Sequence, residues 1–120
     1  MHFERKSTVS PDLLKAEFYN FLSHNMDSFH IYTDGSKDGN AVAAAAVCSS
    51  ITLSCRLSAE ASIFTAEAQA ILLALNIIDS SSHSKYLILS DSMSCLQAIH
   101  HRKVTNPHIL QILEKCQYIF

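Results

Sequence analysis

The sequence predicts an α/β fold with a mixed sheet, and three observations lead to that prediction. Three runs of strand length follow one another before the first long helical pattern. A fourth run, Tyr86 to Ser90, comes after that helix and is followed by two further helical patterns. Because short turns join the first three runs and helices join the later elements, we expect a three-stranded antiparallel meander continued by helix-connected strands, with helices flanking the sheet.

The three meander strands are assigned from their residue patterns. The first runs from Phe29 to Thr33 and is ended by Asp34-Gly35, after which residues 37–40 are all turn-forming. The second, Val42 to Cys48, is apolar throughout. The third, Ile51 to Ser58, alternates apolar with polar residues, so one of its faces should be exposed.

Three helices are expected in the remainder of this region. The first, Ser62 to Ile78, has few polar residues. Asp91-Ser92 can cap a second helix that runs to His100, and Asn106-Pro107 caps a third. The last residues, Tyr118 to Phe120, are typical of a strand, so we expect a fifth strand that is cut off at its beginning.

Residues 1–28 differ in pattern from the rest of the chain. Ser10-Pro11-Asp12 is typical of a helix start, and apolar residues then recur at helical spacing, which predicts a short amphipathic helix. These apolar residues are Leu14, Phe18, Phe21 and Leu22. We therefore divide the chain into an N-terminal connector, residues 1–28, and a domain over residues 29–120. The pattern fits a partner-facing connector and a helix packed on its own domain equally well.

Composition limits the class of protein. At 120 residues and 48% hydrophobic composition, the chain can form one packed core. No apolar run approaches the roughly 18 residues of a membrane span, and the charged start lacks a signal-peptide core. We therefore expect an intracellular protein without a membrane partner. The cysteines form no metal-ligand or disulfide pattern. A formal net charge of −2 argues against a strongly basic nucleic-acid binder but leaves room for a local basic patch.

Three acidic residues stand where a carboxylate contributes little to packing. Asp34 and Asp91 follow apolar strands, and if these strands are parallel neighbours, both aspartates emerge at the same edge of the sheet. Glu67, near the start of the first helix, shares a face with the apolar stripe and should point towards the sheet. A carboxylate there is costly unless it is paired or bound to a cation. The three acids therefore predict a site for a hard divalent ion.

The segments Asp34-Gly35-Ser36, Ala66-Glu67-x-x-Ala70-Ile71 and Ser90-Asp91-Ser92 carry a resemblance through their joint order and spacing. Singly, the first also fits an ordinary turn and the third an ordinary helix cap. Together, over Phe29 to Phe120, they resemble the ribonuclease H domain, most closely that of non-LTR retrotransposon reverse transcriptases. The resemblance implies a mixed five-stranded sheet flanked by helices and an endonuclease that hydrolyses the RNA strand of RNA-DNA hybrids.

The resemblance also implies a cofactor and site residues. Two Mg²⁺ ions, with Mn²⁺ as a substitute, would be held by Asp34, Glu67 and Asp91, with Asp34 bridging both ions. Candidate contacts to the nucleic acid are Ser36, Ser92, Arg102 and Lys103. For the two basic residues, a solvated helix end, where cations suit the helix dipole, explains the pattern equally well.

The chain departs from the family pattern after its third helix. The family completes its site with a fourth carboxylate in a helix after the fifth strand, and Glu114 does not match that position. We therefore expect a C-terminally incomplete domain: either an endonuclease with weakened two-metal catalysis, or a non-catalytic remnant that folds and at most binds nucleic acid or another chain. An incomplete sheet also predicts that the strand ending at Asp91 has an open edge or one covered only by Tyr118 to Phe120, which invites self-association.

Overall fold

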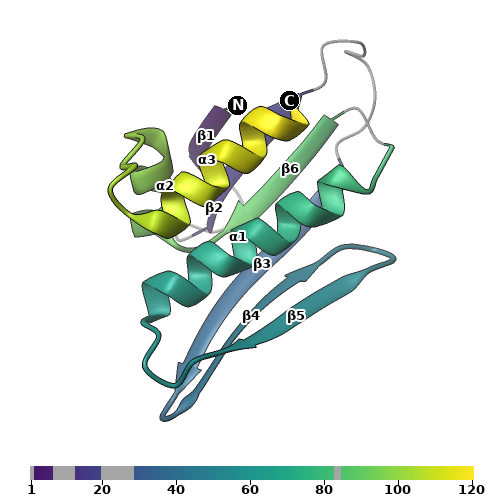
Figure 1. The fold of residues 1–120 in the computed structure, drawn as a ribbon. Helices are drawn as coiled ribbons and strands as arrows, with labels where there is room; N and C mark the ends of the chain where they lie inside the picture. The colour runs from purple at the N-terminus through teal and green to yellow at the C-terminus, as the bar shows by residue number, and fades with distance from the viewer. Residues whose placement is uncertain (1, 7–12, 20–28, 83–84) are drawn as a thin grey trace.

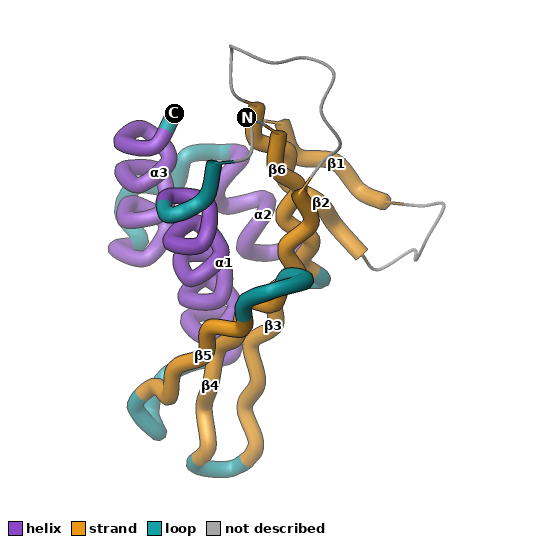
Figure 2. The backbone as a smooth tube through the Cα atoms, turned by 90° about the vertical axis from the view of Figure 1, so that its right-hand side faces the viewer, coloured by secondary structure: helices purple, strands orange, loops and turns teal. Residues whose placement is uncertain are grey.

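The computed structural model of the chain describes residues 2–6, 13–19, 29–82 and 85–120. The strands are β1 (His2–Lys6), β2 (Leu13–Tyr19), β3 (Phe29–Asp38), β4 (Ala41–Val47), β5 (Thr52–Leu57) and β6 (Lys85–Ser90), and the helices are α1 (Ile63–Asp79), α2 (Met93–His100) and α3 (Pro107–Ile119). All three helices lie on one face of the sheet (Figures 1 and 2). The predicted α/β class with a mixed sheet is confirmed.

The sheet joins its strands in the order β1-β2-β6-β3-β4-β5. β3, β4 and β5 form the predicted antiparallel meander. β6 returns after α1 and pairs in parallel with β3, as helical crossover connections allow. The carboxyl ends of β3 and β6 consequently point the same way.

β3 is longer than predicted. The strand does not end at Thr33 but continues to Asp38, and this extension pairs with β4 from Asp34↔Ala45 to Asp38↔Ala41. On its other side, β3 pairs with β6 only as far as Tyr32↔Leu89. Beyond Tyr32, the strands that the structure describes pair with β3 on the β4 side alone.

The hydrophobic core lies between the sheet and the helical layer. Ile71 and Leu75 of α1 pack over Ile31 of β3 and Ile88 of β6, and α3 contributes Ile112; all are fully or almost fully buried. Burying each such side chain stabilises the fold by about 1.5–3 kcal/mol. The described helices are each too short or too polar to cross a lipid bilayer.

The predicted helix in residues 1–28 is wrong for Leu13–Tyr19, which forms β2. β2 pairs antiparallel with β6 from Leu14↔Ser90 to Tyr19↔Lys85, and β1 pairs with β2 in turn. The start signal at residues 10–12 and the apolar residues Phe21 and Leu22 lie outside the described residues. The domain boundary near residue 28 stays a prediction.

The sequence of β2 fits both a helical and a strand periodicity, and pairing within the sheet selects the strand. Leu14 and Phe18 are four residues apart, which suits a helix, but apolar Leu14, Ala16 and Phe18 also alternate with charged Lys15 and Glu17, which suits a strand. A segment of seven residues is too short to form a stable isolated helix. Pairing with the available edge of β6 satisfies its backbone groups instead.

The predicted strand at Tyr118 to Phe120 is also wrong. α3 continues through Ile119, and the Phe120 N–H donates to the Cys116 carbonyl at 2.9 Å. Ile119 packs against the core, and the Phe120 ring meets the Tyr86 ring edge-on, with centroids 6.5 Å apart. These contacts and the helical hydrogen bonds outweigh the strand propensity of three residues.

The open edge expected at the end of the sheet is not at β6. β6 is paired with β3 on one side and β2 on the other, and the outermost described strands are β1 and β5. The expected route to self-association through β6 is therefore closed, because its backbone donors and acceptors already face two neighbours.

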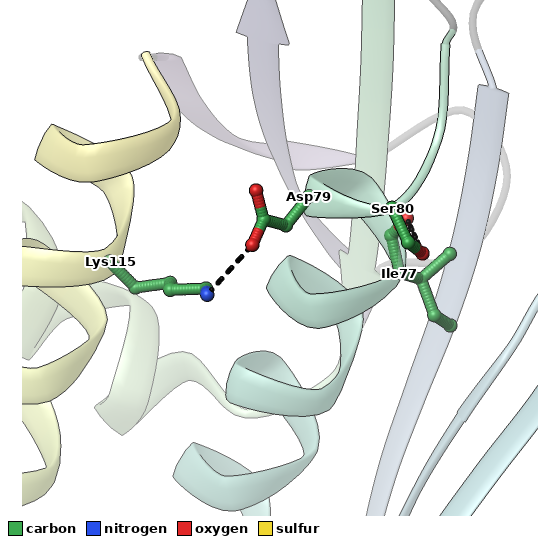
Figure 3. A network of polar contacts seen from close by, with 4 residues as sticks. All are labelled: Ile77, Asp79, Ser80 and Lys115. Atoms are coloured by element: carbon green, nitrogen blue, oxygen red, sulfur yellow. Dashed lines mark hydrogen bonds and ion pairs between the residues drawn. The ribbon is translucent and has the colours of Figure 1, made fainter.

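The C-terminal end of α1 is joined to α3 by an ion pair (Figure 3). The Lys115 Nζ atom lies 3.0 Å from Asp79 Oδ2. Close by, the Ser80 hydroxyl donates to the Ile77 carbonyl at 3.1 Å. A carboxylate at a helix C-terminus is disfavoured by the helix dipole, and the Lys115 ammonium offsets that effect.

Candidate metal centre

Asp34, Glu67 and Asp91 meet where β6 ends. Asp34 belongs to β3, Asp91 follows the last residue of β6, and Glu67 is the fifth residue of α1. One carboxylate oxygen of each residue lies within 4.8 Å of those of the other two. The predicted convergence of these three side chains is therefore observed, although they come from segments far apart in the sequence.

The parallel register of β3 and β6 brings the two aspartates together. The parallel pairs run from Phe29↔Tyr86 to Tyr32↔Leu89, and Asp34 and Asp91 each follow the last pair by two residues. After Ser90 the chain leaves the sheet and enters α2, whose N-cap is Ser92. Both aspartates are exposed at this edge.

Glu67 reaches the aspartates from inside the helix-sheet interface, where the residue is 8% exposed. The start of α1 is fixed by Ser62, whose hydroxyl accepts the Thr65 N–H at 3.1 Å. The Gly35 N–H on β3 donates to Glu67 Oε2 at 3.3 Å. The Glu67 carboxylate is thus oriented by the strand that carries Asp34.

Gly35 allows α1 to approach β3 this closely. A Cβ atom at this position would lie 2.5 Å from the Glu67 backbone nitrogen and 2.6 Å from the Ala66 carbonyl carbon. Neither backbone atom can move without shifting the helix. The interpretation of Asp34-Gly35 as the end of a strand is wrong; the glycine is needed for close approach within a continuing strand.

The pKa of Glu67 is raised from 4.5 to about 7. Burial is the largest cause because it disfavours the charged form, and the neighbouring charges of Asp91 and Asp34 act in the same direction. The hydrogen bond from Gly35 opposes the shift. Among residues 29–82 and 86–120, whose side chains the structure describes, no ion pair involves any of the three acids. A bound cation would offset the like charges that these three carboxylates bring together.

The donor set suits a hard divalent cation. Three carboxylates offer oxygen ligands only, which Mg²⁺ and Mn²⁺ prefer over softer metals. Asp34, Glu67 and Asp91 are the residues that would hold such an ion. Two exposed ligands and one buried ligand leave one side of the centre open to solvent.

The other predicted site residues lie outside this cluster. Ser36 is exposed on β3, opposite Ala43 of β4. Ser92 is buried, and its hydroxyl caps α2 by accepting the Cys95 N–H at 3.4 Å. Arg102 and Lys103 are exposed in the turn after α2, where Arg102 has a φ of 52°. A role for these residues in binding nucleic acid stays a prediction.

Two buried polar groups beside the cluster were missed by the sequence analysis. The Thr33 hydroxyl donates to the Leu89 carbonyl at 3.1 Å, and Cys95 Sγ lies 3.5 Å from the Phe64 carbonyl oxygen. Burial raises the pKa of the Cys95 thiol to about 11, so it stays protonated and can donate. The alternation along β3 places Thr33 on the buried face, and buried hydroxyls need partners; this signal could have identified it.

The comparison with known families agrees with the fold and the cluster. The profile of the reverse transcriptase-like family matches residues 32–120, which include all three acids. No curated protein and no solved structure is significantly similar to the chain. The match covers most of the chain, and the mixed sheet with three helices is compatible with a ribonuclease H-like fold. The chain therefore belongs to the reverse transcriptase-like family, a ribonuclease H-like family.

Proposed function

We propose that this domain is a metal-dependent endonuclease of the ribonuclease H type, which hydrolyses the RNA strand of RNA-DNA hybrids. Asp34, Glu67 and Asp91 serve as its metal ligands. The observation that carries the proposal is the convergence of these three carboxylates at one edge of a ribonuclease H-like domain. The preferred ion is Mg²⁺, and Mn²⁺ can replace it because it also takes oxygen ligands.

Asp34, Glu67 and Asp91 would hold a divalent ion, and that ion would supply activation of water and compensation of the charge that develops on a phosphodiester during hydrolysis. The protein's own contribution is to hold the ligands. Asp34 and Asp91 stand at an exposed edge that a nucleic-acid backbone can reach, and Glu67 is presented from the interior by the Gly35 hydrogen bond. Recognition of a hybrid duplex relies on groove shape and 2′-hydroxyls, so no sequence preference is expected.

Exposed polar residues outside the acidic cluster are the proposed contacts to the hybrid. Ser36 lies two residues beyond Asp34 on β3, and Arg102 and Lys103 follow α2, the helix that begins just after Asp91. Their exposure leaves the two basic side chains free to approach phosphates. The joint order of the three acidic motifs supports an origin in a non-LTR retrotransposon reverse transcriptase.

A second candidate function is a non-catalytic domain that binds a metal ion or nucleic acid without cleaving. It is favoured by the size of the cluster, which contains three acids among the described residues. Glu114, the acid that follows Asp91 in this sequence, lies instead on α3 beside Gln69, Leu72 and Asn76 of α1. Within residues 1–120, three carboxylates can hold one ion, but they leave a second ion with few ligands.

Cleavage of a labelled RNA-DNA hybrid in Mg²⁺ or Mn²⁺ tests these alternatives. The 120-residue chain is compared with a version extended past Phe120 by the C-terminal segment of a related domain, each with and without Asp34→Asn. Cleavage that depends on Asp34 supports the nuclease. Metal binding without cleavage in either version supports the second candidate. Robust hydrolysis that survives Asp34→Asn shows that the active site lies elsewhere.

A further inference from the structure

We infer that Thr33 is a positioning residue of the metal centre: its hydroxyl fixes the spacing between the strand that carries Asp34 and the segment that carries Asp91. The inference rests on the proposed function, because it concerns residues that act as metal ligands there. Thr33 itself is not placed among the ligands; it acts on the centre through the backbone of β6.

The hydroxyl joins β3 to β6 at the last paired residues before the centre. Backbone pairing between these strands ends at Tyr32↔Leu89. Thr33 Oγ1 donates to the Leu89 carbonyl oxygen at 3.1 Å, so the link lies one residue before Asp34 and two before Asp91. Beyond this hydrogen bond, β6 turns away from the sheet into α2.

The Thr33 side chain is held in place by its surroundings. Along β3, Ile31 and Thr33 are buried and face the helical layer, while Tyr32 and Asp34 are exposed. A buried hydroxyl depends on its partner because no water replaces a lost hydrogen bond. The branched side chain of threonine also has few χ1 rotamers, which keeps its hydroxyl in one orientation.

A second hydrogen bond extends the link to Asp91. The Ser92 N–H donates to Ser90 Oγ at 3.1 Å, closing a short turn around Asp91, and Ser90 is 1% exposed. The path from Asp34 to Asp91 therefore runs through Thr33, the Leu89 carbonyl and the Ser90-Ser92 turn. Removing the Thr33 hydroxyl breaks this path between the strands while leaving all three carboxylates present.

Metal affinity responds to such supporting contacts. Residues that orient ligands typically change metal affinity by about 10–100-fold when they are removed. Thr33→Val removes the hydroxyl and keeps the shape of the side chain, whereas Thr33→Ser keeps the hydroxyl. On the 120-residue chain with Mn²⁺ as the probe, calorimetry should show roughly tenfold weaker binding for Thr33→Val, and Thr33→Ser should restore an affinity close to the original.

Ser80→Ala is the control, at an exposed residue. It removes another hydroxyl-to-carbonyl hydrogen bond of the same length, 3.1 Å, at the opposite end of α1 (Figure 3). Thermal unfolding of both variants measures the loss of stability, and calorimetry measures Mn²⁺ binding. We expect Ser80→Ala to leave the Mn²⁺ affinity unchanged, which separates positioning of the ligands from general destabilisation.

The outcomes distinguish the inference from the proposed function. Equal Mn²⁺ affinity in Thr33→Val and the unchanged chain overturns the inference and leaves the metal centre standing, as does an equal weakening by Ser80→Ala. Failure of the unchanged chain to bind Mn²⁺ overturns the metal centre itself. Should Thr33→Val not fold, Thr33→Ser against Thr33→Ala makes the same comparison: tight binding by serine and weak binding by alanine supports the inference, and equal affinities overturn it.

Discussion

Each end of α1 holds an acidic residue, and the two residues have charged neighbours of opposite sign. At the C-terminal end, Asp79 is paired with Lys115 at 3.0 Å (Figure 3). Near the N-terminal end, Glu67 lies close to two further carboxylates and has no ion pair with residues 29–82 or 86–120. The Asp79 carboxylate is neutralised by Lys115 and joins two helices. The Glu67 carboxylate is grouped with like charges, which a bound cation would neutralise.

From the helix dipole alone, Glu67 near the N-terminus of α1 would be the more favourable carboxylate and Asp79 at the C-terminus the less favourable one. The dipole favours a carboxylate near the N-terminus and disfavours one at the C-terminus, by roughly 0.3–1 kcal/mol. Yet the pKa of Glu67 is raised to about 7, chiefly by burial and by Asp91. After a discount for solvent at the open side, this shift corresponds to roughly 1–2 kcal/mol. Burial and like charges therefore outweigh the dipole at this end of α1, where the proposed metal centre lies.

The largest expected effect comes from Asp34→Asn. Loss of this ligand should reduce metal-dependent hybrid cleavage about a thousandfold, equivalent to about 4 kcal/mol of transition-state stabilisation. Without metal the same change should stabilise the fold, because it removes a like charge next to Glu67. Initial rates on labelled hybrid and thermal unfolding in EDTA measure the two effects.

Asp79→Asn is the control at the other end of α1. It should leave metal binding and cleavage unchanged and lower stability slightly, because it removes the partner of Lys115. If both substitutions had the same effects on cleavage and on metal-free stability, the contrast between the two ends would be wrong.

The next effect is that of Gly35→Ala on stability. A new Cβ atom 2.5 Å from the Glu67 nitrogen forces α1 away from β3, and such overpacking costs about 1–3 kcal/mol. Gly39→Ala provides a comparison in the turn after β3, where the φ of 60° is unfavourable for alanine but nothing lies within 4 Å. Urea unfolding should show the larger loss for Gly35→Ala, with weaker Mn²⁺ binding only in that variant. A harmless Gly35→Ala would show that the close approach is unimportant.

Glu67 should make the metal-free fold less stable as the pH rises. Its pKa in the folded chain, about 7, lies above the ordinary value of 4.5, so the folded state retains the proton longer. This contribution to stability is fully present below pH 4.5 and is lost as the pH rises through 7, by roughly 1–2 kcal/mol. Glu67→Gln mimics the protonated form and should flatten the dependence. Unfolding in EDTA between pH 4.5 and 8 measures it.

Divalent metal supplies the second half of that test. Because Mg²⁺ competes with the proton, it should stabilise the unchanged chain more at pH 8 than at pH 5 and should have little effect on Glu67→Gln. If the stabilisation by Mg²⁺ depended on pH identically in the unchanged chain and in Glu67→Gln, Glu67 would not be a metal ligand.

The smallest effect is expected from the ion pair at the other end of α1. Lys115 and Asp79 are 27% and 40% exposed, so solvent and salt screen their attraction. A double-mutant cycle with Lys115→Met and Asp79→Asn should give a coupling energy of roughly 0.2–1 kcal/mol that declines in salt. A coupling energy well above that range would mean that electrostatic interactions at this end of α1 are as strong as those around Glu67.

The sequence by itself determined the α/β class, most of the elements after residue 28, and the three acids. These features are local: alternation marks β5, the long apolar pattern marks α1, and the capping residues Ser92 and Asn106 mark where α2 and α3 begin. Acids placed after buried strands also stand out locally, because a carboxylate there gains nothing from packing. Convergence of the two aspartates followed from one topological rule, parallel pairing across a helical crossover, and the direction of Glu67 followed from the apolar face of its helix.

The tertiary structure alone decided the features that depend on neighbours distant in sequence. Leu13–Tyr19 is a strand because the edge of β6 pairs with it, and the chain stays helical to Ile119 because α3 packs on the core. Gly35 became a contact residue, and Thr33 a link between strands, because α1 and Leu89 lie against β3 in space. Short segments have nearly equal local preferences for helix and strand, so their tertiary partners supply the free energy that selects one.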